Sequence, residues 1–220
     1  IQTNLIHNSH KFGIKKFLFL GSVCIYPKFA ITPVKEESLL CGELEPTNEA
    51  YAIAKMHGIK LLKSYNKQYG LDGISLMPCN LYGPKDNFHP LNSHVIPSLI
   101  RKFHFANSGF VECWGDGTPL REFMYVDDFA EACLIAMRSE IKNGEHLNVG
   151  TGEEVSIKAL AEMISEITNF SGEIIWDKSK PNGTPKRSLS YSRILELGWK
   201  PKCKLNKGLE KSYKWFKENV

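Results

Sequence analysis

The chain has no apolar run long enough to cross a membrane and no closely spaced cysteine pair. A membrane-spanning helix needs about 20 consecutive apolar residues, so no span is predicted. The six cysteines form no C-x-x-C motif. In a chain of 220 residues they indicate reduced thiols of a cytoplasmic protein, not a disulfide framework. The sequence shows no signal peptide and no internal repeat.

A strong charge of one sign is also missing, because 28 basic side chains face 24 acidic ones and the net charge is only +4. The lysines are scattered and no nucleic-acid-binding motif is present, so we predict no nucleic-acid partner. We also predict no metal site. Hydrophobic residues make up 42% and charged residues 24% of the chain. These values are ordinary for one globular domain, or for one domain with a small additional lobe.

A glycine-rich phosphate-binding turn is the third missing feature. The apolar residues 17–20 predict a buried parallel strand, preceded by the end of a helix over 4–12. A dinucleotide-binding sheet would have roughly three strands before this one, the first followed by a G-x-G-x-x-G-like turn. No such motif precedes Lys16, and we expect that about 80 to 100 residues of the natural protein come before this sequence.

What the sequence does contain is a tyrosine and a lysine four residues apart, Tyr51 and Lys55, near the start of a predicted helix. We expect Thr47 or Asn48 to cap this helix, which runs to about Tyr69 and ends at Gly70. On a helix this spacing places both side chains on one face. An ammonium near a phenol favours the phenolate, and such a phenol can exchange a proton with an alkoxide. The rest of this helix has an apolar stripe predicted to pack in the core: Ala54, Ile59, Leu62, Tyr65 and Tyr69.

Polar residues follow the predicted strand over 17–20 and a second one over 74–77. The first strand ends in Gly21-Ser22-Val23-Cys24, and the second is followed by Pro78-Cys79-Asn80-Leu81. Ligands of open α/β sheets bind at the carboxyl ends of the strands, so these residues are candidates for a site.

The second half of the chain alternates between predicted strands and helices. The predicted helices cover 93–106, 127–139, 157–168 and 207–219, and the predicted strands cover 110–114, 122–126, 146–149 and 173–176. Three residues here have two open interpretations. His94 is either structural or an acid–base group, Arg121 is either a solvated side chain or a diphosphate ligand, and Trp114 is either core or a stacking plate.

A serine followed by Y-x-x-x-K between two parallel strands resembles the short-chain dehydrogenase/reductase superfamily. Within it, the blocks 21–27, 44–55, 80–90 and 92–97 are similar to the GDP-L-fucose synthase family. The resemblance implies an α/β fold with an NAD(P)-binding, Rossmann-like, doubly wound parallel sheet whose N-terminal strands are missing. A smaller C-terminal α/β substrate lobe accompanies it. We expect residues 1–90 in the sheet domain and 91–220 mainly in the lobe, with 123–150 returning to the sheet.

The resemblance also implies an activity: NADPH-dependent conversion of GDP-4-keto-6-deoxy-D-mannose to GDP-L-fucose, by epimerisation at C3 and C5 and reduction at C4. The partners implied are NADP(H), a GDP-sugar and a second copy in a homodimer that forms through the helix bearing Tyr51. The catalytic residues implied are Ser22, Cys24, Tyr51, Lys55 and His94. The cofactor-binding residues implied are Leu20, Gly21, Ser22, Val23, Tyr51, Lys55, Pro78, Cys79, Asn80, Leu81 and His94, and the substrate-binding residues implied are Lys102, Trp114, Arg121 and Asn182.

Two alternatives remain at this point. Another extended reductase is possible, although a dehydratase would need an acidic pair where Val23 and Cys24 stand. The other alternative is a non-catalytic relative that keeps only sugar-nucleotide binding. Three positions depart from the family pattern, with Val23 in place of a serine, Cys79 in place of a threonine and Asn182 in place of an aspartate.

Overall fold

Two units are built from interleaved segments of the chain in the computed structural model, which describes residues 1–107 and 109–220. The first unit contains residues 1–79, 128–152 and 188–201, and the second contains 80–127, 153–187 and 202–220. The first change of unit therefore comes at Asn80, earlier than the expected limit at residue 90. Residues 188–201, which we expected in the lobe, belong to the first unit.

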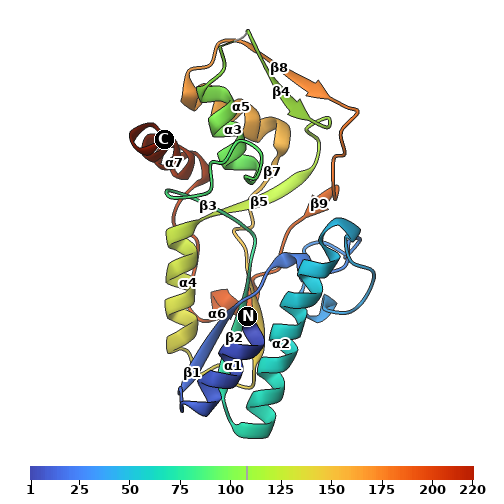
Figure 1. Cartoon of the computed structure of the whole chain (residues 1–220), viewed down its shortest axis with the longest axis vertical. Coiled ribbons are helices and arrows are strands. Elements are labelled where there is room, and N and C mark those ends of the chain that lie inside the picture. The colour runs from blue at the N-terminus through green and yellow to red at the C-terminus, as the bar shows by residue number, and fades with distance from the viewer. Residues whose placement is uncertain (108) are drawn as a thin grey trace. The chain divides into compact units, whose positions relative to one another are not determined.

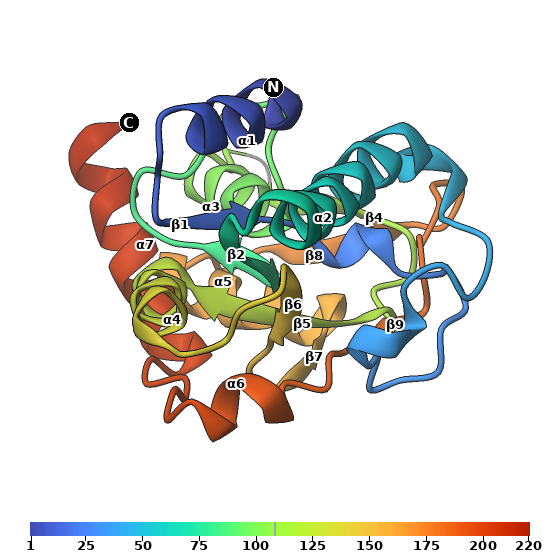
Figure 2. The same ribbon diagram turned by 90° about the horizontal axis from the view of Figure 1, so that it is seen from below.

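The first unit is a Rossmann-like arrangement of a parallel sheet covered by helices (Figure 1). Its strands are paired in the order β1-β2-β6, with Leu18 opposite Ile74 and Leu76 opposite Leu147. Helices α1 and α2 lie on one side of this sheet, and α4 and α6 on the other (Figure 2). The bounds are α1 Gln2–Lys11, β1 Lys16–Leu20, α2 Glu49–Tyr69, β2 Asp72–Pro78, α4 Val126–Arg138, β6 Glu145–Val149 and α6 Ser192–Glu196.

The buried face of α2 differs from the predicted stripe. Ala52, Met56, Ile59 and Leu62 are buried, whereas Ala54 is exposed. Helix α1 lies along α2, and the Gln2 side chain donates to the Ala54 carbonyl oxygen at 2.7 Å. The stripe prediction was therefore wrong at Ala54 and also at Tyr69, which is half exposed and stacks on His10 of α1.

A glycine lets α2 approach the sheet closely. A Cβ atom on Gly58 would lie 2.4–2.9 Å from ring atoms of Phe19, so only glycine fits against this ring. The helix ends at Gly70, which has a φ of +71° and donates its N–H to Asn66, as predicted for a glycine stop. Asn48 precedes the helix without a side-chain capping bond, so the predicted side-chain cap was wrong there.

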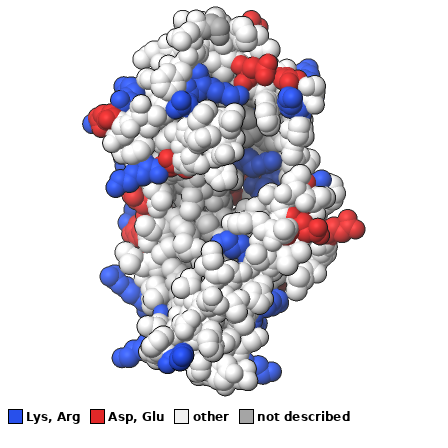
Figure 3. All heavy atoms as spheres, in the orientation of Figure 1, with Lys and Arg blue, Asp and Glu red and all other residues white. Residues whose placement is uncertain are grey.

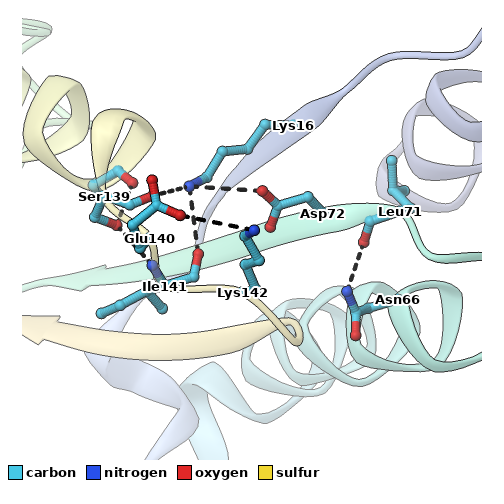
Figure 4. A network of polar contacts seen from close by, with 9 residues as sticks. Lys16, Asn66, Leu71, Asp72, Ser139, Glu140, Ile141 and Lys142 are labelled. Atoms are coloured by element: carbon cyan, nitrogen blue, oxygen red, sulfur yellow. Dashed lines mark hydrogen bonds and ion pairs between the residues drawn. The ribbon is translucent and has the colours of Figure 1, made fainter.

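The amino ends of β1 and β2 are joined to the end of α4 by Lys16 (Figure 4). Its ammonium donates to the carbonyl oxygen of Ser139 at 2.6 Å and lies 3.8 Å from Asp72. A cation at the C-terminal end of a helix satisfies carbonyl groups that have no partner within the helix. This contact holds the edge of the sheet opposite to the one that carries Ser22.

The second unit packs three helices against short strands. Strands β3, β5 and β7 form one sheet, in which β9 also pairs with β5, and β4 pairs with β8. On the face drawn in Figure 3, acidic and basic side chains alternate with broad uncharged areas. The bounds are β3 Asn80–Tyr82, α3 Val95–His104, β4 Phe110–Trp114, β5 Leu120–Tyr125, β7 Glu154–Ser156, α5 Ile157–Thr168, β8 Glu173–Asp177, β9 Lys186–Arg187 and α7 Leu205–Asn219. The buried core of the second unit includes Tyr82, Phe88, Ile100, Phe103, Phe123, Leu160, Ile164 and Phe216.

Candidate active site

The residues after β1 form a single helical turn, Val23–Ile25, that presents Ser22 and Cys24. Val23 and Ile25 are buried, whereas Ser22 and Cys24 are half-buried. The Ser22 Oγ accepts the backbone N–H of Cys24 at 3.2 Å. Because this bond uses a lone pair of the serine oxygen, the hydroxyl proton of Ser22 stays available for another acceptor.

Helix α2 packs against this turn and brings Tyr51 and Lys55 to the end of β1. The Lys55 ammonium donates to the Leu20 carbonyl oxygen at 2.8 Å and lies 5.6 Å from the centroid of the Tyr51 ring. Burial lowers the pKa of Lys55 from its usual value. The Tyr51 side chain is 49% exposed, so its phenol is accessible to a ligand.

The residues after β2 are divided between the two units. Cys79 is buried in the first unit and its N–H donates to the Val149 carbonyl oxygen at 3.0 Å. Asn80 and Leu81 belong to β3 of the second unit. The Asn80 side chain donates to the Glu122 carbonyl oxygen at 2.8 Å, which aligns β3 with β5.

A pocket of about 240 Å³ lies within the second unit and brings together Trp114, Arg121 and Asn182. These are three of the four residues that the sequence predicted to bind substrate. Trp114 is 62% exposed, and the Lys180 ammonium lies 5.8 Å from its ring centroid. The rest of the lining consists of Asn80, Val95, Gly117, Pro119, Phe123 and Ile157.

Two arginines lie side by side in this unit. Arg121 of β5 is the register partner of Arg187 of β9 in a parallel pair, so both side chains project from the same face. Burial lowers the pKa of Arg121, and the positive charge of Arg187 lowers it further. A partly buried cation beside another cation favours an anionic ligand. Sequence reasoning missed Arg187, because basic pairs such as Lys186-Arg187 are common on solvated surfaces.

Asn182 also fixes the turn between β4 and β5. Its Oδ1 accepts the backbone N–H of Asp116 at 2.9 Å. The flanking Gly115 and Gly117 both have positive φ angles, and a Cβ on Gly115 would collide with the Asn182 amide. Asn182 therefore holds its own loop against the turn that lines the pocket.

Of the predicted cofactor residues, Asn80 lines this pocket, whereas His94 and Lys102 are not among its lining residues. His94 is exposed at the position before α3 and makes no side-chain capping bond. Lys102 donates to the Glu112 carbonyl oxygen at 2.8 Å and lines a different depression together with Arg101 and Phe105. The structure does not place Lys102 in the Trp114 pocket.

No helix formed by the described residues is long and apolar enough to span a membrane.

Known proteins resemble this chain in sequence and in fold. Residues 1–150 match the NAD dependent epimerase/dehydratase family. A probable GDP-L-fucose synthase of Oryza sativa subsp. japonica is 55% identical over the whole chain, which spans 68% of that relative. A GDP-L-fucose synthase of Escherichia coli is 50% identical, and the chain spans 72% of it. The solved structure of a GDP-L-fucose synthetase of Naegleria fowleri bound to NADP has a TM-score of 0.93 at 31% identity, covering 99% of this chain and 71% of that one.

The chain therefore belongs to the NAD dependent epimerase/dehydratase family of extended short-chain dehydrogenases/reductases. Within this family its similarity is to the GDP-L-fucose synthases of plants and bacteria.

Proposed function

We propose that this chain converts GDP-4-keto-6-deoxy-D-mannose to GDP-L-fucose with NADP(H) as its cofactor. The observation that carries this proposal is the packing of α2 on the Ser22–Cys24 turn, with Lys55 anchored to Leu20 beside Tyr51. A hydroxyl, a phenol and an ammonium at the carboxyl end of a strand are the groups that reduction of a carbonyl needs.

The chemistry divides into proton transfers and one hydride transfer. NADPH, when bound, supplies the hydride to C4 of the sugar. The Lys55 ammonium donates one N–H to the Leu20 carbonyl oxygen. Its two other N–H groups are suited to bind ribose hydroxyls. Ser22 donates to the keto oxygen, and Tyr51 protonates the alkoxide that forms there.

Epimerisation comes before reduction. The 4-keto group acidifies the protons on C3 and C5, and a base removes each while an acid returns a proton to the opposite face. We assign Cys24 and His94 to these roles. Support for Cys24 comes from its half-buried place two residues after Ser22, and support for His94 from its exposed ring at the start of α3. A thiolate and an imidazole both exchange protons readily near neutral pH.

The GDP part of the substrate is assigned to the pocket of the second unit. The paired charges of Arg121 and Arg187 suit a diphosphate, and the exposed Trp114 ring offers a plate for stacking. We assign a further contact to Asn182. These assignments rest on chemistry and on the shared family pattern.

The proposal is tested by incubating the full-length protein with GDP-4-keto-6-deoxy-D-mannose and NADPH. We expect loss of absorbance at 340 nm and appearance of GDP-L-fucose by ion-exchange chromatography. Substrate consumed without NADPH oxidation would point to another enzyme of the family, such as an epimerase. Binding of GDP without any turnover would favour a cofactor-free binding protein.

We further propose a cytoplasmic homodimer that forms through α1 and α2. Support comes from exposed apolar side chains on these two helices, Leu5 and Ile53, and from the absence of disulfides among the described cysteines. Light scattering coupled to gel filtration should give twice the monomer mass. The Ile53→Glu variant should give a monomer, and a monomeric wild-type chain would contradict the proposal.

A further inference from the structure

A buried tyrosine ends the turn that carries Ser22 and Cys24. Tyr26 has 1% of its surface exposed, and its backbone N–H closes the turn on the Val23 carbonyl oxygen at 3.2 Å. Its hydroxyl donates to Asn148 Oδ1 at 2.6 Å. This hydrogen bond ties the turn, which follows β1, to a different strand, β6.

Asn148 connects this tyrosine to a third segment. It is fully buried, and its Nδ2 donates to the Val34 carbonyl oxygen at 2.9 Å. Its backbone N–H donates to the buried carboxylate of Glu36, also at 2.9 Å. In a site this well shielded from water, each polar group depends on its protein partner, because no water replaces a lost hydrogen bond.

We propose that Tyr26 and Asn148 are positioning residues that hold Cys24 in its reactive place. This inference rests on the proposed function, since it assumes that Cys24 takes part in the proton transfers. A single turn of this type has poor hydrogen-bond geometry of its own. Its position over the sheet therefore depends on the side chain that anchors its end, and that side chain is Tyr26.

The test compares two substitutions of the same kind. Tyr26→Phe removes the hydroxyl and keeps the ring, so it opens no cavity. Tyr82→Phe is the matched control, because the Tyr82 hydroxyl is also hydrogen-bonded at a buried site, to the Leu205 carbonyl oxygen of the second unit. The first measurement is the rate at which iodoacetamide alkylates Cys24, relative to the exposed Cys41 in the same digest. We expect this ratio to rise at least about threefold in Tyr26→Phe and to stay unchanged in Tyr82→Phe.

The second measurement is deuterium incorporation from solvent at C3 and C5 of the GDP-sugar. We expect the rate constant to fall about tenfold in Tyr26→Phe, as for the loss of one buried hydrogen bond, with KM within about twofold of wild type. An unchanged Cys24 ratio in Tyr26→Phe, or equal effects in both variants, would overturn the inference. A wild-type chain that incorporates no deuterium would instead overturn the proposed function, and the alkylation ratio would still decide whether Tyr26 positions Cys24.

Discussion

Arg121 and Arg187 are partners across two parallel strands, and both project from the same face of the sheet. Neighbouring like charges repel, so the pair is stabilised when an anion lies between them. The preceding residue, Lys186, points to the opposite face and pairs with Glu154 at 2.9 Å. The strand β9 thus places Arg187 beside Arg121 and Lys186 beside Glu154.

The first prediction concerns this pair. Arg187→Gln should weaken GDP binding about tenfold, since it removes a charged hydrogen-bond donor to the diphosphate. The salt dependence of binding should become shallower. Titration calorimetry at two salt concentrations measures both effects, with Lys186→Gln as the control of unchanged affinity. Equal affinity in Arg187→Gln and wild type would show that Arg187 does not contact the nucleotide.

The second prediction concerns Tyr51. Tyr51→Phe should slow reduction by about 10² to 10⁴-fold, because the alkoxide loses its proton donor. NADPH binding should change little, since Lys55 stays in place. Tyr65→Phe on the same helix is a suitable control, as its hydroxyl lies near His7 instead. Stopped-flow measurement of NADPH oxidation would detect the difference, and a Tyr51→Phe variant with wild-type rates would rule out this assignment.

The third prediction concerns the contact of Gly58 with Phe19. Alanine normally stabilises a helix interior relative to glycine by about 1 kcal/mol. Here overpacking against the ring should cost about 1–3 kcal/mol, so Gly58→Ala should lower the melting temperature. Adding Phe19→Leu should recover part of the loss, which a double-mutant cycle measures. A Gly58→Ala chain more stable than wild type would refute the close packing of α2.

The fourth prediction concerns pH. Burial raises the pKa of Glu36 above its usual value, with smaller opposing effects from its hydrogen bonds. Its contribution to stability is therefore present below the pKa of the unfolded chain and is lost as pH rises through the folded-state pKa. Glu36→Gln has no such titration, so its stability relative to wild type should increase between about pH 4 and neutral pH. Urea unfolding at several pH values tests this, and a pH-independent difference would argue against a raised pKa.

Local signals in the sequence predicted much of this structure. The strand β1, Lys16–Leu20, contains the predicted residues 17–20, and α5, Ile157–Thr168, has the predicted bounds. Ser156 caps α5 by accepting the N–H of Ala159 at 3.0 Å. These features depend on residues close together in the chain, where spacing and side-chain chemistry determine the outcome. The family resemblance, not a local signal, implied that Trp114, Arg121 and Asn182 share one site, and one pocket is lined by all three.

Features that depend on distant segments were not predictable in the same way. The strand β5 begins at Leu120, two residues before the prediction, because β9 and β7 pair with its first residues. Arg187 becomes a neighbour of Arg121 only through that pairing. Likewise, the packing of α1 against α2, with Gln2 bonded to the Ala54 carbonyl oxygen, leaves no periodic signal in α2 itself.

The most direct test of the account is a fluorescence titration of the full-length protein with NADPH, with GDP binding measured in parallel. The account predicts saturable binding of both ligands, since Lys55 and the turn after β1 serve one and the Trp114 pocket serves the other. Binding of GDP without binding of NADPH would contradict it and would indicate a protein that recognises sugar nucleotides without reducing them.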